Sequence, residues 1–377
     1  MTSHYYLLPF RFDKIACQEL LVNELGDFLF MPAGTVDKIA KHKLEAANDI
    51  YKDLLANHFI SPTPIPPLIN NMAVRLRTKK AFLENFTALH IFVLTLRCNQ
   101  NCIYCQASSK GSSDSCYDMK KQDLLAAIKL MFQSLSSSIT MEFQGGEPSL
   151  AVELFRLALE VSTEQNKTFK KQITYVLCSN SVHLTDEVLS LCRQYQVLIS
   201  TSLDGPEFLH NSNRGKKDSY AKVVQGIEKA RNWLGKDQVS ALMTASEQSL
   251  KYPREIVDSY IQHGFHSVFL RPLNPYGLAR ENKNWDAYFD KFFAFYKQAL
   301  TYIIELNRNG IYFVEEYTAI LLRKILTPFS TGFVDLQSPS GIVNSVVVYN
   351  YDGYVYASDE SRMLAEYGDT TFRLGSV

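Results

Sequence analysis

Residues 89–105, which read LHIFVLTLRCNQNCIYC, decide the architecture of this chain. The first eight form an apolar run that predicts a buried strand. Cys98, Cys102 and Cys105 follow with the spacing C-x3-C-x2-C, which places the thiols on the loop at the carboxyl end of that strand. Three thiolates on one short loop can hold three corners of a four-iron cluster and leave the fourth iron open for a small-molecule ligand.

Strand-like and helical patterns alternate outward from this stretch. Apolar runs recur along the chain, and each is followed by a segment with helical spacing of its apolar residues. Six such repeats predict an α/β fold over residues 86–325, with parallel strands in an open, partial (β/α)6 TIM-like barrel whose functional loops lie at the carboxyl ends of the strands. The expected strands are 89–97, 138–145, 172–179, 196–203, 238–245 and 266–273, and the expected helices are 118–135, 150–164, 185–195, 219–233, 252–263 and 285–309.

Residues 1–80 predict a small module in front of the barrel. Apolar runs within residues 5–31, with turn residues at 23–27, predict a small antiparallel sheet. Helical spacing follows from about 35 to 57. The proline-rich residues 61–67 then predict a stiff linker.

Residues 326–377 predict a short extension after the barrel. The apolar run 342–349 predicts a strand, 350–353 (NYDG) a hairpin turn, and 354–356 a return strand. The extension is therefore expected to begin with a β-hairpin.

The composition excludes several classes of protein. Lys and Arg total 39 among the 377 residues, as do Asp and Glu, so the net charge predicts no attraction to nucleic acid or to an anionic membrane. No stretch reaches the roughly 18 apolar residues of a membrane helix, and no signal peptide is evident. Seven cysteines in such a chain indicate reducing surroundings, so we expect a cytoplasmic protein.

A zinc site or a disulfide could also explain the clustered cysteines. A structural zinc site usually takes four ligands, often in two separated pairs, and the chain has no second C-x2-C pair. A disulfide would leave an odd thiol. Outside the loop, Cys178 and Cys192 fall in apolar segments and are expected to be inert core thiols, and Cys116 is expected to be an incidental thiol in a polar loop.

A second motif, Gln144-Gly145-Gly146-Glu147-Pro148, follows the second predicted strand. Its two glycines would let a ligand approach the backbone closely. Glu147 adds a negative charge that could hold an ammonium group, and Pro148 ends the strand. Alone this motif is an ordinary turn, but here it lies one repeat after a three-cysteine loop and at the same edge of the predicted sheet.

With both motifs, residues 86–310 resemble the radical S-adenosylmethionine (radical SAM) enzymes. Those enzymes carry a three-cysteine loop after the first barrel strand and a Gly-Gly-Glu motif after the second, and Tyr104 matches the aromatic residue before their third cysteine. The resemblance implies that Cys98, Cys102 and Cys105 hold a [4Fe-4S] cluster whose open iron binds SAM. It further implies that one electron cleaves SAM and that the resulting 5′-deoxyadenosyl radical abstracts a hydrogen atom from the substrate.

The resemblance extends to other strand ends. It implies that Asn180 contacts the cofactor and that Ser202 and Asp204 lie near its ribose and carboxylate, while Arg214 lies where peptide-modifying members have an arginine. For Asn180 and Asp204 the alternative is capping of the next helix. The cofactor-binding residues that we expect are Tyr104, Gly145, Gly146, Glu147, Pro148, Asn180, Ser202, Asp204 and Arg214.

Two further polar residues lie near these positions. His210 is expected to be a solvated loop residue. Arg271 lies at the end of the sixth predicted strand and could face a substrate or pair with a neighbouring acid.

The sequences near both ends of the chain resemble a narrower group within this family. Residues 7–12 (LLPFRF), 20–24 (LLVNE), 349–353 (YNYDG) and 358–366 (SDESRMLAE) are similar to the B-type radical SAM maturase of His-Xaa-Ser systems. This implies a small ribosomally made peptide with His-Xaa-Ser repeats as substrate, and an electron donor as a second partner. The auxiliary-cluster (SPASM-like) domain of that family is not matched, because no cysteine follows Cys192. We therefore expect a single cluster and a C-terminally truncated chain.

Three functions fit these patterns. The first is a radical SAM enzyme that modifies a peptide, with residues 1–80 docking the peptide by strand addition. The second is a radical SAM enzyme that acts on another protein side chain, as sulfatase maturases do, or on a small molecule. The third is a non-catalytic metal-binding scaffold.

Overall fold

The computed structural model describes residues 4–64, 66–281 and 284–377. Residues 1–3 of the predicted N-terminal module lie outside the described residues, as does Ile65 of the predicted proline-rich linker.

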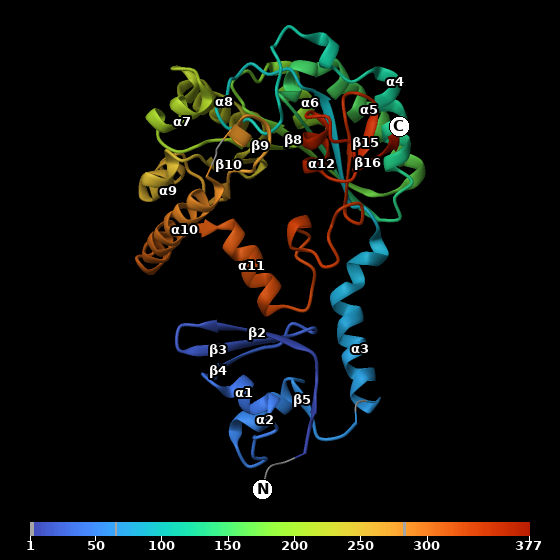
Figure 1. Ribbon diagram of the computed structural model, residues 1–377. Coiled ribbons are helices and arrows are strands. Elements are labelled where there is room, and N and C mark those ends of the chain that lie inside the picture. Colours follow the sequence, from blue (N-terminus) through green and yellow to red (C-terminus); the bar gives the residue numbers. More distant parts are fainter. Residues whose placement is uncertain (1–3, 65, 282–283) are drawn as a thin grey trace. The chain divides into compact units, whose positions relative to one another are not determined.

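The chain divides into two compact units (Figure 1). The larger comprises Leu83–Ile320 and Val334–Val377, and the smaller comprises Met1–Phe82 and Leu321–Phe333. The larger unit contains both the three-cysteine loop and the Gly-Gly-Glu motif.

A parallel sheet forms the centre of the larger unit. Six of its strands pair in the order β12-β10-β9-β8-β7-β6, and every pair among them is parallel, which confirms the predicted α/β fold with a partial barrel. The expected sixth strand is divided into β11 and β12, and β11 pairs with β13 instead. The strands are β6 (Leu89–Thr95), β7 (Ser138–Gly145), β8 (Gln172–Ser179), β9 (Leu198–Ser202), β10 (Val239–Ala245), β11 (Ser267–Val268), β12 (Leu270–Pro272) and β13 (Val314–Glu315).

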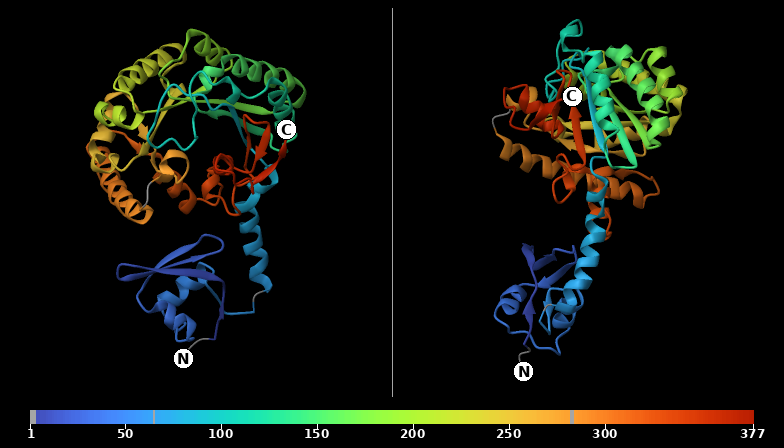
Figure 2. Two further views of the ribbon diagram at one scale, coloured as in Figure 1. Left: turned by 45° about the horizontal axis from the view of Figure 1, so that its top comes forward. Right: turned by 90° about the vertical axis from the view of Figure 1, so that its right-hand side faces the viewer.

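Helices cover the outer face of this curved sheet (Figure 2). Their apolar sides meet the strands in one core, in which the rings of Phe155 and Phe143 cross at 90° with centroids 4.9 Å apart. Within the described residues, no helix is both long and apolar enough to cross a membrane. These helices are α4 (Lys121–Met131), α5 (Val152–Phe169), α6 (Asp186–Gln194), α7 (Glu207–Arg214), α8 (Ser219–Leu234), α9 (Pro253–Gln262) and α10 (Trp285–Arg308). A further helix, α11 (Glu316–Leu326), has no buried residue and is not part of this core.

Polar side chains lie on the inner face of β7 and β8, whereas the inner face of β6 is apolar. Side chains alternate between the two faces of a strand, so the neighbours of the buried Phe143 and Leu177 point away from the helices. Those neighbours include Glu142, Gln144 and Cys178, all half-buried. The barrel therefore presents hydrogen-bonding side chains to its interior, near the carboxyl ends of its strands.

Helix α7 was not predicted. It begins after Pro206 and ends at Gly215, whose left-handed conformation (φ 67°) suits glycine. The buried side of the helix includes His210 and Arg214. The expectation that His210 is a solvated loop residue is wrong, since only 1% of its surface is exposed.

The C-terminal segment continues the barrel sheet. β14 pairs in parallel with β6 and antiparallel with β15, which confirms the predicted hairpin. The first hairpin strand is shorter than the expected 342–349. Helix α12 and strand β16, which pairs with β15, were not predicted. The elements are β14 (Val346–Tyr349), β15 (Tyr354–Tyr356), α12 (Asp359–Ala365) and β16 (Arg373–Ser376).

The smaller unit contains the antiparallel sheet predicted near the N-terminus. The order is β2-β3-β4, and the predicted turn at 23–27 joins β3 to β4. Asn23 stabilises this turn because its Oδ1 accepts the N–H groups of Leu25 (2.9 Å) and Asp27 (3.0 Å). The strands are β1 (Tyr6–Leu7), β2 (Phe10–Ile15), β3 (Gln18–Asn23), β4 (Phe28–Pro32) and β5 (Ile60–Ser61).

The helices of the smaller unit differ from the prediction. The helix expected over about 35–57 is two helices, because the chain turns between them and Asn48 caps the second by accepting the N–H of Ile50 (2.9 Å). A third helix begins within the proline-rich residues 61–67, since proline fits the first turn of a helix. The helices are α1 (Thr35–Ala40), α2 (Asp49–Ala56) and α3 (Pro66–Lys80).

Short 3-10 helices complete the secondary structure. They are η1 (Ala81–Asn85), η2 (Ser115–Tyr117), η3 (Pro148–Ala151), η4 (Lys236–Gln238), η5 (Ser249–Lys251), η6 (Gly277–Glu281) and η7 (Val334–Leu336).

Candidate functional site

The three-cysteine loop, residues 98–105, leaves the carboxyl end of β6, as the sequence predicts. Cys98, Cys102 and Cys105 are all free thiols and half-buried. The Cys105 N–H donates to the carbonyl of Cys102 (3.1 Å), which turns the second half of the loop back on itself. One short segment therefore presents three thiols at the end of the first barrel strand.

Burial makes the thiols of Cys98 and Cys102 hard to ionise by themselves. It raises the pKa of Cys98 to about 12, and it raises the pKa of Cys102 although the Arg214 guanidinium opposes the shift. A buried thiolate needs nearby positive charge, which bound iron supplies. In the described part of the chain, no three His, Cys, Asp or Glu side chains are grouped for one metal ion. A four-iron cube does not require such a group, because each thiolate binds a different iron.

Polar side chains face the sulfur atoms. Asn180 Nδ2 lies 3.8 Å from the Sγ of Cys98, and Arg214 Nη1 lies 3.5 Å from the Sγ of Cys102. The Cys105 thiol donates to Ser109 Oγ (3.3 Å). Hydrogen-bonding groups around ligand sulfurs are characteristic of protein-bound iron–sulfur clusters, so the residues present fit a [4Fe-4S] cluster.

The two glycines of the second motif pack against backbone. A Cβ atom on Gly145 would lie 2.0 Å from the carbonyl oxygen of Thr95, and one on Gly146 would lie 2.3 Å from that of Arg97. The Gly146 N–H donates to the Thr95 carbonyl (2.9 Å), and the Glu147 N–H to the Arg97 carbonyl (2.7 Å). The glycines thus let the end of β7 approach the chain that enters the three-cysteine loop.

The Glu147 carboxylate is 1% exposed and already has several donors. Its Oε1 accepts from Ser149 Oγ (2.6 Å), Ser149 N (3.2 Å) and Ser179 Oγ (2.8 Å), and its Oε2 accepts from Asn180 N (2.7 Å). Burial raises the pKa of Glu147 while these donors oppose the shift. The carboxylate therefore joins the ends of β7 and β8, and Pro148 begins the short helix η3 beside it.

Asn180 faces the three-cysteine loop. Its Oδ1 accepts the N–H of Val182 (3.0 Å), and its Nδ2 donates to Asn99 Oδ1 (2.7 Å) as well as lying near the Cys98 sulfur. Helix α6 is capped by Thr185 instead, whose hydroxyl accepts from Val188 N (3.2 Å). The capping alternative for Asn180 is therefore not what the structure shows.

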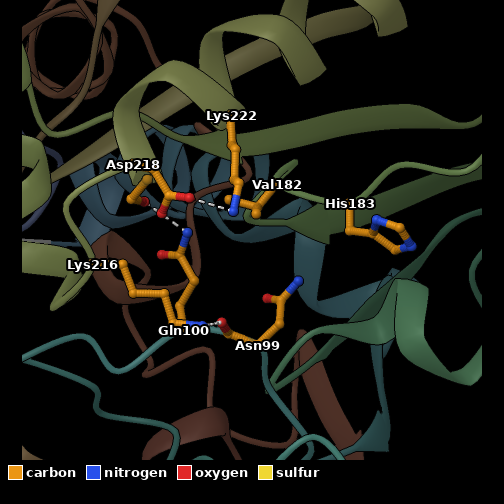
Figure 3. Close-up of a pocket in the computed structure, with 8 residues that line it drawn as sticks. Asn99, Gln100, Val182, His183, Lys216, Asp218 and Lys222 are labelled. Carbon is orange, nitrogen blue, oxygen red and sulfur yellow. Dashed lines mark hydrogen bonds and ion pairs between the residues drawn. The ribbon is translucent and has the colours of Figure 1, made fainter.

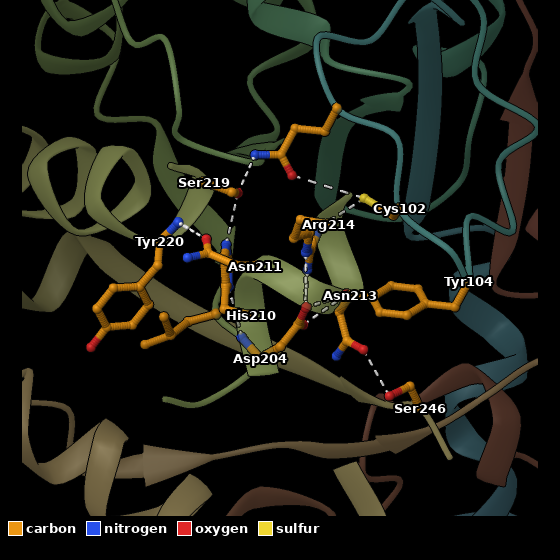
Figure 4. A network of polar contacts seen from close by, with 12 residues as sticks. Cys102, Tyr104, Asp204, His210, Asn211, Asn213, Arg214, Ser219, Tyr220 and Ser246 are labelled. Carbon is orange, nitrogen blue, oxygen red and sulfur yellow. Dashed lines mark hydrogen bonds and ion pairs between the residues drawn. The ribbon is translucent and has the colours of Figure 1, made fainter. Parts of the chain in front are cut away.

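Asp204 and Arg214 form a buried ion pair (Figure 4). Arg214 Nε donates to Oδ2 of Asp204 (2.9 Å) and Nη2 donates to Oδ1 (3.0 Å). The Tyr104 hydroxyl lies 2.7 Å from both carboxylate oxygens. The arginine lowers the pKa of Asp204 against the opposing effect of burial. Ser202, on the inner face of β9, lies half-buried two residues before this carboxylate.

His210 links this ion pair to the first half of the three-cysteine loop. Its Nδ1 accepts the Asp204 N–H (3.3 Å), and its Nε2 lies 3.0 Å from Ser219 Oγ, to which Gln100 Nε2 also donates (2.8 Å). Burial lowers the pKa of His210 to about 4, so the imidazole is neutral near pH 7. Sequence reasoning missed this network, because no local pattern relates Gln100, His210 and Ser219.

A pocket of about 230 Å³ lies beside the three-cysteine loop (Figure 3). Lys216 Nζ donates across it to the Asn99 carbonyl (2.6 Å), and Lys222 forms an ion pair with Asp218 (2.5 Å). The residues that line it are Asn99, Gln100, Val182, His183, Lys216, Asp218, Ser219 and Lys222.

The other residues singled out from the sequence, three cysteines and Arg271, differ in how deeply they are buried. Cys192 is fully buried, as expected of a core thiol. Cys178 lies on the inner face of β8, outside the core covered by helices, and is half-buried. Burial and the nearby Glu142 raise its pKa, so the thiol is inert as expected. Arg271 is half-buried. Burial raises the pKa of Glu142, and the nearby charge of Arg271 opposes that shift. Cys116 is exposed.

Residues 92–259 match the family model of the radical SAM superfamily. That family uses a [4Fe-4S] cluster and SAM. A cysteine-type anaerobic sulfatase-maturating enzyme of Clostridium perfringens is 23% identical over 270 residues, which cover 70% of this chain and 71% of that protein. Among four of the curated relatives that it matches, the chain spans between 52% and 72% of the relative's length.

Solved structures share the fold. The structure of native anSMEcpe with bound AdoMet superposes with a TM-score of 0.60 and 23% identity, covering 76% of this chain and 77% of that one. The structure of Streptococcus suis SuiB bound to the precursor peptide SuiA superposes with a TM-score of 0.55 and 13% identity, covering 99% and 86% of the two chains. These likenesses agree with the partial barrel described above.

Proposed function

We propose that this chain is a radical SAM enzyme, which the family match over residues 92–259 supports. It would cleave SAM at a [4Fe-4S] cluster held by Cys98, Cys102 and Cys105 and modify a ribosomally made peptide. When bound, the cluster would supply the electron for reductive cleavage of SAM, and SAM would in turn supply the means to remove a hydrogen atom from the substrate. The peptide that we propose is rich in His-Xaa-Ser repeats, the second partner is an electron donor, and the location is the cytoplasm.

One observation carries the cluster assignment. Three free thiols lie on a single loop at the carboxyl end of β6, next to the strands β7 and β8, whose inner face carries polar side chains. The sulfurs of Cys98 and Cys102 each have an amide or guanidinium donor within reach. This arrangement supports a cluster that is open toward the barrel interior.

The SAM site is proposed to lie along the neighbouring strand ends. Gly145, Gly146 and Pro148 would border it from the end of β7, Asn180 from the end of β8 and Ser202 from β9. Three further side chains, those of Tyr104, Asp204 and Arg214, would close it from the side of the three-cysteine loop, and the Glu147 carboxylate would hold the ends of β7 and β8 together beneath it.

Anaerobic reconstitution tests the cluster. We expect about four irons per chain and reductive release of 5′-deoxyadenosine. Changing Cys98, Cys102 and Cys105 to Ala should abolish both. A double change of Cys17 and Cys116 to Ala removes two exposed thiols and should abolish neither. Iron and cleavage activity retained by the triple variant would refute the assignment.

The smaller unit has a sheet edge suited to a peptide. In the described part of that unit, β4 pairs with β3 alone. β4 contains no charged residue and exposes Phe30, whereas the other edge strand, β2, carries Arg11, Asp13 and Lys14. Charged residues on an edge discourage strand pairing. We propose that the leader of the peptide adds to β4 as a further strand.

A second candidate is modification of a protein side chain outside His-Xaa-Ser peptides. The similarity to sulfatase-maturating enzymes favours it. Mass spectrometry separates the two candidates when reconstituted enzyme is offered a His-Xaa-Ser peptide and a sulfatase-derived peptide in parallel reactions. A mass change in the sulfatase peptide alone would replace the first candidate by the second, and no 5′-deoxyadenosine in either reaction would favour a non-catalytic scaffold.

A further inference from the structure

The guanidinium of Arg214 divides its donors between a carboxylate and a thiol. Nε and Nη2 form a fork on the two oxygens of Asp204, at 2.9 and 3.0 Å, while Nη1 lies 3.5 Å from the Sγ of Cys102 (Figure 4). A guanidinium is planar, so the bidentate fork fixes the direction of the third nitrogen. The charge of Arg214 is thus held against one specific cysteine.

Burial strengthens the electrostatic effect of the Arg214 charge on its neighbours. The side chains of Asp204 and Arg214 are 0% and 7% exposed, so little water screens them. The Tyr104 hydroxyl lies 2.7 Å from both oxygens of the carboxylate and keeps it in place. An ion pair with this burial acts on its neighbours more strongly than a surface pair does.

Helix α7 fixes the distance between the ion pair and the loop. The Ile103 N–H donates to the carbonyl of Asn213 (2.9 Å), one residue before Arg214. At the end of the helix, a Cβ atom on Gly215 would lie 2.7 Å from the Asn101 carbonyl oxygen. The segments on either side of Cys102 are therefore packed directly against the end of the helix that carries Arg214.

We propose that Arg214 and Asp204 set the reduction potential of the cluster that Cys102 helps to hold, Arg214 raising it and Asp204 lowering it. Reduction adds negative charge to the cluster, so a guanidinium at a ligand sulfur stabilises the reduced state and a carboxylate opposes it. The inference rests on the proposed function for the presence of the cluster. It assigns Arg214 to the cluster itself, in addition to any contact with SAM.

A redox titration without SAM tests this inference. The amount of reduced cluster is followed by electron paramagnetic resonance as the potential is lowered. Arg214→Gln should lower the equilibrium constant for reduction about tenfold, which is 59 mV for one electron. Asp204→Asn should shift the potential in the opposite direction, and Arg214→Lys, which keeps the charge, should shift it less than Arg214→Gln.

Lys216→Gln is the matched control. Lys216 is also cationic and also bonds to the three-cysteine loop, but its Nζ meets the carbonyl of Asn99 rather than a sulfur (2.6 Å). Because Lys216 is exposed, water screens its charge and its removal should leave the potential close to that of the unaltered chain.

The outcomes are distinct. Shifts of opposite sign for Arg214→Gln and Asp204→Asn support the proposal. Damage to packing would not make the direction of the potential shift depend on the sign of the charge that is removed. An unchanged potential in Arg214→Gln together with weaker SAM binding overturns it and leaves Arg214 as a SAM contact only. If Asp204→Asn does not fold, equal shifts in Arg214→Gln and Arg214→Lys overturn it. An unaltered chain that takes up no iron refutes the proposed function instead.

Discussion

The Oε2 atom of Glu147, at the end of β7, accepts the backbone N–H of Asn180, at the end of β8, at 2.7 Å. The same Asn180 donates through its side chain to Asn99 in the three-cysteine loop (2.7 Å). Glu147 is thereby two hydrogen bonds away from the loop, although the sequence suggested that its charge could hold an ammonium group. Three adjacent strand ends are joined through this one carboxylate.

Glu147→Gln should therefore lower stability before it affects any cofactor. The amide would place an NH2 group opposite a donor that now meets a carboxylate oxygen, and a buried unsatisfied group costs about 1–3 kcal/mol. We expect a lower thermal midpoint of the iron-free protein. Glu160→Gln makes the same change at an exposed helix position and should leave the midpoint unaltered. An unaltered midpoint in Glu147→Gln combined with weaker SAM binding by calorimetry would favour the ammonium contact instead.

Gly146→Ala should reduce cluster uptake. Its new methyl group would collide with the carbonyl oxygens of Leu96 (2.4 Å) and Arg97 (2.3 Å), backbone atoms that lead into the three-cysteine loop. Gly111→Ala is the control, because a Cβ atom there meets only the side chain of Asp114 (3.2 Å). Iron bound per chain after reconstitution measures the effect. Full iron content in Gly146→Ala would show that the loop tolerates a displaced β7.

Protonation of His90 should lower the stability of the folded protein in acid. Burial lowers its pKa to about 4, and its ring bonds to Tyr349 Oη (3.1 Å) and the Thr87 carbonyl (3.2 Å). The unfolded chain binds the proton more readily, so stability is lost as pH falls from about 6.5 toward 4, by about 3 kcal/mol for this group. Urea unfolding at several pH values should show a shallower pH dependence for His90→Gln. His183→Gln, at an exposed position, is the matched control, and equal slopes in all three proteins would contradict the prediction.

Phe30→Lys should weaken binding of the leader peptide. The change places a charge on β4, the edge proposed to receive the peptide strand, and charged edges resist pairing. Phe12→Lys alters a similarly exposed phenylalanine on β2, at 54% against 50% for Phe30, and should bind normally. Fluorescence anisotropy with a labelled His-Xaa-Ser precursor should show a Kd at least about tenfold higher for Phe30→Lys alone. Equal affinities would exclude β4 as the docking edge.

The barrel could be predicted because its signals are local. The expected strands 138–145 and 172–179 agree with β7 and β8 to the residue, since apolar runs bounded by turn residues mark strand ends within a few positions. Helix α7 escaped prediction because its residues are mostly polar, and three of its four buried residues are polar side chains, those of His210, Asn213 and Arg214. The helix expected over 35–57 was too long. Helical spacing alone does not reveal the turn that separates α1 from α2, where Asn48 caps the second helix.

For the candidate site, the sequence determined the three cysteines, the two glycines and their place after consecutive strands, because spacing along a chain is a local property. The tertiary structure alone decided what surrounds them. Arg214 meets Cys102 from 112 residues away, and Asn180 meets Cys98 from 82 residues away. Such contacts arise because parallel strands bring their carboxyl ends to one edge of the sheet, where the side chains of separate loops converge. Which donor then reaches which sulfur depends on packing and burial in three dimensions, and no periodicity in the sequence encodes it.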